Sequence, residues 1–144
     1  MISLQPMARI MAIDFGSKRM GIAVTDPLCI IATPLTTLHP KDSIAFFTTY
    51  FQQEEVSCVV FGKPMQNDGS PSESMPALLA YLGNFKKAFP GMKVEMMDER
   101  FTTKMAKETM FEAGLGKMKR RDKALTDRTS AVIILQSYMM KNGL

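Results

Sequence analysis

The stretch RIMAIDFGSKRMGIAV, residues 9–24, joins two apolar segments through a short polar turn. Residues 8–14 predict a fully apolar and therefore central β-strand, and residues 19–25 predict its hairpin partner across the turn FGSK. Asp14 ends the first of these strands. A carboxylate at the end of a buried strand costs free energy unless another group compensates its charge. Three roles remain open for Asp14: binding a metal ion, holding a nucleotide phosphate and capping a turn.

The rest of the chain predicts strands that alternate with helices. Further strands are predicted at 29–38, 56–62 and 92–97, and helices at 42–53, from Ser70 to about Ala88, 102–113 and 123–141. This order indicates parallel pairing beside the initial antiparallel hairpin. We therefore expect an α/β fold with a mixed sheet and helices on both faces. In such sheets, sites gather where the strands end.

Two local signals predict how elements begin or pair. Pro34 places part of the third strand at a sheet edge or a bulge, because proline has no amide hydrogen for a strand ladder. Ser70, Pro71 and Glu73 form a helix start, with a capping serine, a proline in the first turn and a capping-box glutamate.

The size and composition of the chain limit its class. Its 144 residues fit one domain over 1–144, with 46% hydrophobic and 22% charged residues. The net charge of +4 mildly favours a polyanionic partner. Cys29 and Cys58 lie in apolar runs, so we expect two buried thiols rather than a disulfide framework or zinc site. No long apolar segment occurs, so we expect a cytoplasmic protein that does not enter membranes.

Carboxylates stand at the ends of several predicted elements. Asp14 ends the first strand, Asp98 and Glu99 follow the strand MKVEMM, and Asp127 lies near the start of the last helix. Helical spacing puts Asp127 on the face of residues 131, 134, 135 and 138, which is apolar and must pack on the sheet. We therefore expect its side chain to point inward. Ser130 and Ala131 are small and would let this helix approach the sheet closely.

These acids suggest metal chemistry if they converge. Their repulsion would be relieved by sharing a proton, which raises a pKa, or by binding a divalent cation. Oxygen ligands suit Mg²⁺ or Mn²⁺, and His39, the only histidine, disfavours a zinc cluster or a histidine-based triad. Two metals about 3.5–4 Å apart are a common device for phosphodiester hydrolysis. Independent caps and surface acids are the alternative explanation.

Basic residues lie beside the last of these acids. Six of the 18 lysines and arginines fall within twelve positions, at Lys117, Lys119, Arg120, Arg121, Lys123 and Arg128. This Gly-containing basic loop suits a phosphate backbone, although a charge run is also typical of a solvated segment. Lys18 and Arg19 could contact phosphates from the hairpin. Arg100 either contacts phosphate, orients a carboxylate or forms a structural salt bridge.

Four motifs in order resemble one known family. AIDFGSKRMGIAV, VVFGKPMQNDGS, DERFTT and TDRTSAVIILQSYM together resemble the YqgF family, described as Holliday-junction resolvases or pre-16S rRNA nucleases. The resemblance implies a ribonuclease H-like fold, with a five-stranded mixed sheet flanked by helices on both faces. It also implies a metal-dependent nuclease with Asp14, Asp127 and one or both of Asp98 and Glu99 as its acids. Glu99 is favoured, because related resolvases use a glutamate there.

The same resemblance extends to cofactors and to a loop. Two ions, Mg²⁺ or Mn²⁺, would be bound together with the substrate. Asn67, Asp68 and Gly69 could shape a substrate groove, although Asp-Gly is equally typical of a plain turn. Gly16 is expected to leave room beside Asp14.

Four functions compete at this point. Processing of the 5′ end of pre-16S rRNA is favoured, with an rRNA precursor or pre-ribosomal small subunit as partner. Resolution of four-way DNA junctions uses the same chemistry and needs a dimer, so monomer and homodimer both stay open. The first hairpin also resembles that of sugar-kinase and actin-type ATPases, but those need two lobes. A non-catalytic ribosome-assembly factor is the fourth possibility.

Overall fold

Five strands form one mixed sheet in the computed structural model, which describes residues 8–66, 68–98 and 123–144, with backbone alone for 123–129. The sheet order is β3-β2-β1-β4-β5. The strands are β1 (Arg9–Phe15), β2 (Met20–Thr25), β3 (Ala32–Leu38), β4 (Val56–Lys63) and β5 (Lys93–Asp98), and the helices are α1 (Pro40–Gln53), α2 (Met75–Ala88) and α5 (Lys123–Lys141). β1, β2 and β3 pair antiparallel, whereas β1, β4 and β5 pair parallel. The predicted mixed sheet is confirmed.

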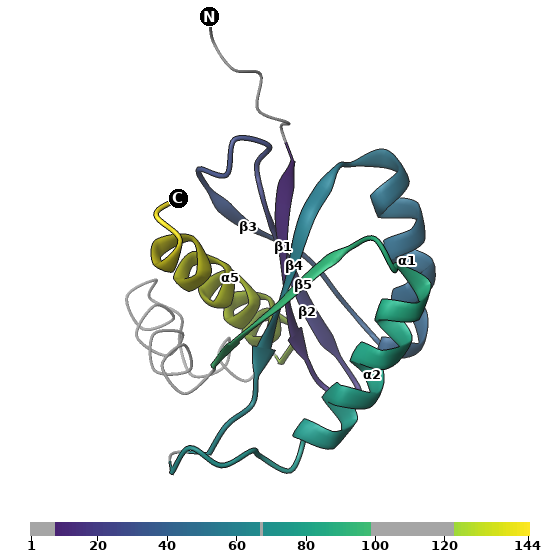
Figure 1. Cartoon of the computed structure of the whole chain (residues 1–144), viewed down its shortest axis with the longest axis vertical. Helices are drawn as coiled ribbons and strands as arrows, with labels where there is room; N and C mark the ends of the chain where they lie inside the picture. Colours follow the sequence, from purple (N-terminus) through teal and green to yellow (C-terminus); the bar gives the residue numbers. More distant parts are fainter. Residues whose placement is uncertain (1–7, 67, 99–122) are drawn as a thin grey trace, which may run out of the picture.

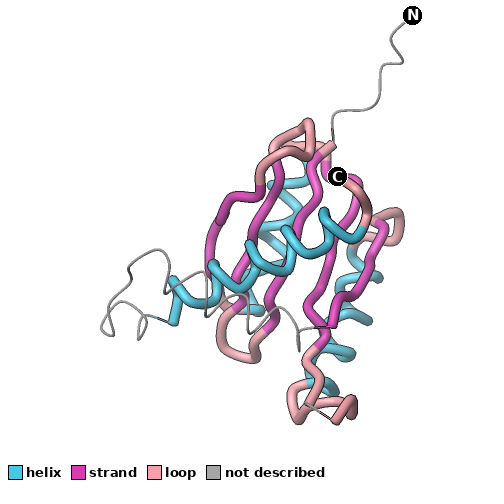
Figure 2. The backbone as a smooth tube through the Cα atoms, turned by 90° about the vertical axis from the view of Figure 1, so that its left-hand side faces the viewer, coloured by secondary structure: helices cyan, strands magenta, loops and turns pink. Residues whose placement is uncertain are grey.

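The helices cover both faces of this sheet. Figure 1 shows α1 and α2 on one side and α5 on the other, and Figure 2 shows α5 crossing the strands in front of them. In both views the N-terminal end of α5 lies at the lower end of the sheet, the end at which β1 and β4 finish, and in Figure 2 it projects past one side of the strands. This arrangement brings the start of the last helix to the end of the sheet where Asp14 lies. None of the helices described here is long and apolar enough to cross a membrane.

The two faces of the sheet are packed with different side chains. Strand alternation sends Met11 and Ile13 of β1 toward α1 and α2, where Phe47, Phe61 and Phe85 are fully buried. The other face carries small or slender side chains, among them Ala12, Ala23, Cys58 and Val60, and these pack with Ala131 of α5. Small residues let a helix lie close to a sheet. Ala131 is fully buried in this layer, in keeping with the expectation that the last helix packs on the sheet at this residue.

The hairpin turn between β1 and β2 depends on a glycine. A Cβ placed on Gly16 would lie 2.6 Å from the carbonyl oxygen of Arg19, closer than real Cβ atoms approach a backbone atom. Gly16 was expected to leave room beside Asp14. The close neighbour that it admits is the backbone at Arg19, so its role is to let the turn close.

The first helix begins earlier than its periodicity suggested. α1 starts at Pro40 rather than at residue 42, because His39 caps it and accepts a hydrogen bond from the Lys41 amide at 3.0 Å.

The second helix begins later than predicted. α2 starts at Met75, with Ser74 as its first flanking residue, so the predicted start at Ser70, Pro71 and Glu73 is wrong. Pro71 instead pairs with Met65 in an isolated β-bridge, and the Ser72 amide donates to the Pro64 carbonyl at 3.0 Å. These contacts hold the chain in an extended loop.

The third strand is shorter than predicted and lies at an edge. It begins at Ala32 rather than at residue 29, because the Asp26 carboxylate accepts hydrogen bonds from three amides of the preceding loop, those of Leu28, Ile30 and Ile31. Cys29 in this loop has a φ of 56° and is only half-buried, so the prediction of two buried thiols holds for Cys58 alone. β3 is an edge strand whose register shifts beside Pro34, as the proline predicted.

Candidate functional site

Asp14 lies at the carboxyl end of the central strand and is half-buried. Alternation along β1 places it with Ile10 and Ala12, the residues that contact the α5 layer. Its neighbour Phe15 points the other way, where its ring lies 5.1 Å from that of Tyr81. Asp14 therefore lies on the α5 side of the sheet, at the end toward which the N-terminus of α5 points.

Two glycines flank this position on the neighbouring strands. Gly21 of β2 is directly opposite Asp14 in the antiparallel ladder. On the other side, Gly62 follows Phe61, the partner of Ile13 in the parallel ladder. Both glycines fall on the α5 side by alternation, so neither β2 nor β4 places a side chain next to the Asp14 carboxylate. Neither glycine was predicted from the sequence, although the hairpin register alone would have paired Gly21 with Asp14.

Two exposed cations follow Asp14 on the same hairpin. Lys18 and Arg19 occupy the turn between β1 and β2, and both are solvent-exposed. The turn closed by Gly16 therefore holds two positive charges at the end of the sheet where the carboxylate lies. The structure agrees with their predicted location, whereas their contact with nucleic acid stays a prediction.

Asp98 ends β5, two strands away from Asp14. Strand spacing puts the two strands about 10 Å apart. Alternation aligns Asp98 with Val94 and Met96, which pack on the α1 and α2 side, and pairs it in register with Lys63. The register thus places Asp98 on the opposite face from Asp14. A catalytic role for Asp98 remains a prediction, and this placement does not favour it.

Several predicted site residues lie outside the part that the structure describes. These are Glu99, Arg100, Lys119, Arg120 and Arg121, together with the helix predicted at 102–113. Lys123 begins α5 and Asp127 lies in its second turn, and for both only the backbone is described. Asp127 precedes the buried Ala131 by one helical turn.

The donor chemistry available here suits a hard divalent cation. No three His, Cys, Asp or Glu side chains gather into a metal-binding group within residues 8–66, 68–98 and the described side chains of α5. Two of the three predicted ligands, Glu99 and Asp127, stand outside that search. Asp14 supplies carboxylate oxygens, which Mg²⁺ and Mn²⁺ prefer, and the flanking glycines add no side chain at the neighbouring ladder positions. The residues that are described therefore fit the predicted metal.

The loop after β4 is organised as a turn. One carboxylate oxygen of Asp68 accepts hydrogen bonds from the amide and the hydroxyl of Ser70, at 2.9 and 2.6 Å. Gly69 has a φ of 90°, which favours glycine. These contacts account for the Asp-Gly pair as turn chemistry. Asn67 lies outside the described residues, and its contribution to a groove stays a prediction.

Comparison with known proteins identifies close relatives. A family model described as RuvX, Holliday junction resolvase, matches residues 8–141. A protein of Flavobacterium psychrophilum is 49% identical over 135 residues, which cover 94% of this chain and 98% of its own length. A protein of Christiangramia forsetii is 50% identical over 133 residues, covering 92% and 98% of the two chains. Both relatives are named, provisionally, as pre-16S rRNA nucleases.

Solved structures resemble this fold at low sequence identity. RuvC of Thermus thermophilus in complex with a Holliday junction substrate superposes with a TM-score of 0.56 at 18% identity, covering 94% of this chain and 96% of that one. A second RuvC structure from the same organism gives a TM-score of 0.55 at 15% identity. At this identity the likeness concerns the fold alone, and it confirms the predicted ribonuclease H-like architecture.

Proposed function

Because this chain belongs to the RuvX family, which the sequence motifs also indicated under the name YqgF, we propose that it processes the 5′ end of pre-16S rRNA as a metal-dependent nuclease. It is a hydrolase of phosphodiester bonds, as the family and the relatives' names indicate. The described sheet and helices suit a single nuclease domain over residues 1–144. An rRNA precursor as substrate keeps the cytoplasm as the expected location.

The placement of Asp14 carries this proposal. It is a half-buried carboxylate at the end of the central strand, it faces α5, and it has glycines at both neighbouring strand positions. The neighbouring ladder positions on β2 and β4 carry no side chain, which suits a carboxylate that must meet an ion and a phosphate group.

Asp14, Glu99 and Asp127 are the proposed metal ligands. Alternation along β5 places Asp98 on the face of the sheet opposite Asp14. This supports Glu99, the next residue in the chain, as the acid that joins Asp14 and Asp127. Asp127 lies in the second turn of α5, the helix that covers the Asp14 face. Bound Mg²⁺ or Mn²⁺ would supply charge neutralisation and an activated water for hydrolysis. The protein itself contributes carboxylates held at fixed element ends.

The cations of the hairpin are proposed to bind the substrate backbone. Lys18 and Arg19 are exposed in the hairpin turn that follows Asp14, and Gly16 allows this turn to close tightly. Phosphate contacts of this kind position a nucleic acid without reading its sequence. Arg100, Lys119, Arg120, Arg121 and Lys123 are proposed to extend the same binding surface.

Junction cleavage is the second candidate function. The family model bears the description Holliday junction resolvase, and the RuvC relative by fold was solved on such a junction. Two symmetric incisions would need a homodimer, whereas trimming of one RNA end needs only a monomer. The names of the more similar relatives favour the RNA substrate.

A side-by-side cleavage assay tests the proposal. The purified chain is incubated with a pre-16S rRNA leader and with a four-way DNA junction, each with Mg²⁺, with Mn²⁺ and with EDTA. We expect divalent-dependent cleavage of the RNA leader, and we expect Asp14→Asn to abolish it. Asp42→Asn, which alters an exposed acid in the first turn of α1, is the matched control and should cleave like the wild type.

The outcomes separate the candidates. Cleavage of the junction but not of the leader would replace RNA processing by junction resolution. Full activity of Asp14→Asn would remove the metal-site proposal. Binding of the precursor without cleavage by any form would indicate an assembly factor.

A further inference from the structure

Exposed apolar side chains gather beside the connection between β2 and β3. Among the residues that the structure describes, six large apolar side chains are more than half exposed, and one of them, Leu79, lies on α2. The other five are Leu28, Ile30 and Ile31 in the β2–β3 connection, and Met140 and Leu144 at the C-terminal end of α5. We call these five residues the apolar patch.

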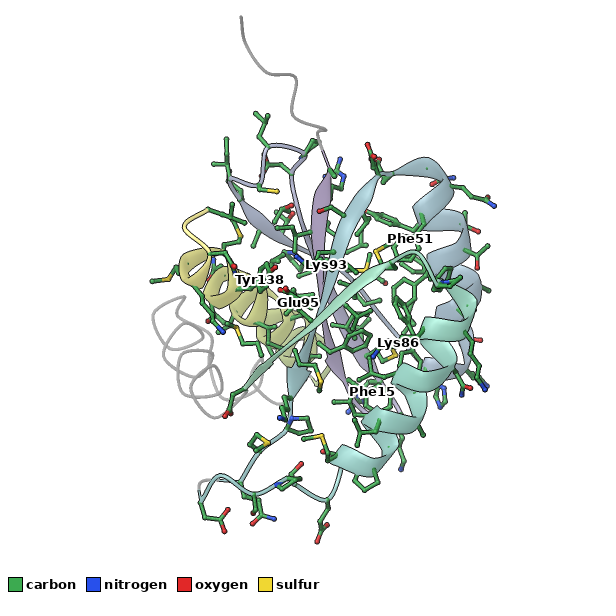
Figure 3. All side chains as sticks on the ribbon, in the orientation of Figure 1. Phe15, Phe51, Lys86, Lys93, Glu95 and Tyr138 are labelled. Carbon is green, nitrogen blue, oxygen red and sulfur yellow. The ribbon has the colours of Figure 1, made fainter. Side chains whose placement is uncertain are left out.

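The two parts of the apolar patch are neighbours in space. Figures 1 and 2 both show the C-terminal end of α5 next to the β2–β3 connection. Cys29 of this connection packs against the core cluster that contains Met139 of α5, and the Leu144 amide donates to the Met139 carbonyl at 2.8 Å. Figure 3 shows Tyr138 on the side of α5 that faces the sheet, whereas Met140, two residues later, is 74% exposed. The patch is therefore one surface built from two elements.

A buried turn of hydrogen bonds fixes the loop that carries three of these side chains. The Asp26 carboxylate accepts from the amides of Leu28, Ile30 and Ile31, at 3.1, 2.7 and 2.7 Å. The backbone amides of the loop are thus bonded within the loop itself, while its apolar side chains point to solvent. A loop fixed in this way loses little conformational freedom when a partner covers it.

Cys29 anchors the same loop to the sheet. Its φ of 56° lies in the left-handed region, which residues other than glycine rarely adopt. Its thiol donates to the Ala8 carbonyl at 3.4 Å, and the Thr25 hydroxyl donates to its sulfur at 3.7 Å. Backbone strain of this kind persists only where surrounding contacts hold it, and it is often found at functional sites.

We infer that the apolar patch is the contact surface of a symmetric homodimer, in which it packs against the same patch of a second copy. The five exposed side chains present about 600 Å², more than a scattering of single apolar residues gives. A stable interface buries about 800 Å² on each partner, so the patch supplies most of what a dimer needs.

The charges of the patch favour a second copy as the occupant. Asp26 is the only charged residue of the β2–β3 connection, and its carboxylate already accepts three amides of its own loop. Lys141 is the only charged side chain among residues 139–144, and it is exposed. A surface so poor in charge needs no oppositely charged partner. Two identical apolar patches complement each other across a twofold axis.

This dimer leaves the Asp14 site uncovered. Thr25, the residue before the β2–β3 connection, accepts from the Ile10 amide at 2.9 Å, so the connection lies where β1 begins. Asp14 lies four residues further along β1, about 13 Å away. The two copies of Asp14 therefore lie at the outer ends of the pair. The inference is independent of the proposed nuclease function.

Sedimentation equilibrium of the purified chain tests the dimer. Between about 1 μM and 500 μM, the wild type should pass from mainly monomer to mainly dimer. Leu28→Lys puts a charge into the patch of both copies and should raise the dissociation constant at least about tenfold. Met140→Lys changes the α5 part of the patch and should have the same effect.

Leu79→Lys is the matched control. It makes the same chemical change at a side chain of nearly equal exposure, 55% against 59% for Leu28. It lies on α2, on the other side of the sheet from α5, and should dimerise like the wild type. All three positions are exposed, so the melting temperatures of the monomeric variants should match that of the wild-type monomer.

A wild type that stays monomeric over the whole concentration range would overturn the inference. A dimer that persists at wild-type strength in both Leu28→Lys and Met140→Lys would do the same, because the contact would then lie elsewhere. Equal weakening by Leu79→Lys would also overturn it, since the association would then depend on general surface charge.

Discussion

Gly16 and Arg19 meet so closely that a Cβ on the glycine would lie 2.6 Å from the arginine carbonyl oxygen. We therefore expect Gly16→Ala to force the hairpin open and to cost about 1–3 kcal/mol of unfolding free energy, as overpacking does. The displaced turn carries Lys18 and Arg19 and follows Asp14 directly, so cleavage should fall by more than the loss of folded protein explains. Urea unfolding and cleavage per folded molecule measure the two effects.

Gly83→Ala provides the contrast. No atom outside its own helix backbone lies within 4 Å of a Cβ at this position in α2. Alanine has the higher helix propensity, so this variant should gain up to about 1 kcal/mol in stability and keep full activity. If Gly16→Ala and Gly83→Ala have the same free energy of unfolding, the predicted clash between a Cβ at position 16 and the Arg19 carbonyl oxygen would be wrong.

The hairpin cations should act on affinity and on its salt dependence. Replacing Lys18 and Arg19 by glutamine should weaken binding of the precursor leader and lower the slope of log affinity against log salt by about 1–2. Fluorescence anisotropy across a salt series measures both. Lys87→Gln, at the exposed end of α2 that leads toward the start of β5, is the control and should leave the slope unchanged.

The aromatic layer should determine stability without altering the chemistry. Phe85 is fully buried and its ring lies within about 6 Å of those of Phe47, Phe61 and Phe89. Phe85→Leu should cost about 1–2 kcal/mol. Because this layer lies on the face away from α5, kcat per folded molecule should stay at the wild-type value. A large fall in kcat at full folding would show that the two faces are coupled.

The pKa of Glu95 predicts how stability depends on acid. The Tyr138 hydroxyl, followed by the nearby Lys93 and Lys141, lowers this pKa in the folded protein from the unperturbed 4.5. The unfolded chain therefore binds the proton first, so the stabilisation is present above pH 4.5 and is lost as the pH falls through the lower folded-state value. Wild type should lose more unfolding free energy than Glu95→Gln between about pH 5 and pH 3. A difference that stays constant down to pH 3 would contradict the lowered pKa of Glu95.

Sequence patterns predicted the sheet because its strands have unambiguous apolar runs. β1 and β4 are buried on both faces, so their segments are continuously apolar, and Pro34 marked the edge strand. The starts of α1 and α2 were less predictable. Ser70, Pro71 and Glu73 satisfy every rule for a helix start, but the long-range pairing of Pro71 with Met65 overrides these local preferences.

Part of the candidate site could likewise be predicted from a single segment of sequence, and part depends on contacts between distant segments. Asp14 was found from its place at a strand end, and its location is as predicted. Gly21 and Gly62 flank it through ladder register. Such relations depend on how elements pack together, and no spacing within a single segment reveals them. The placement of Asp98 on the face opposite Asp14 likewise follows from the register of β5.

Substitutions on the two faces of the sheet should affect different properties of the protein. Bulky aromatics fill the face under α1 and α2, whereas the α5 face combines small residues, the flanking glycines and Asp14. Substitutions on the aromatic face should change the thermal stability of the protein. Substitutions on the α5 face should change its nuclease activity. Stabilising substitutions for biochemical work are therefore best sought beneath α1 and α2, where repacking leaves the reaction untouched.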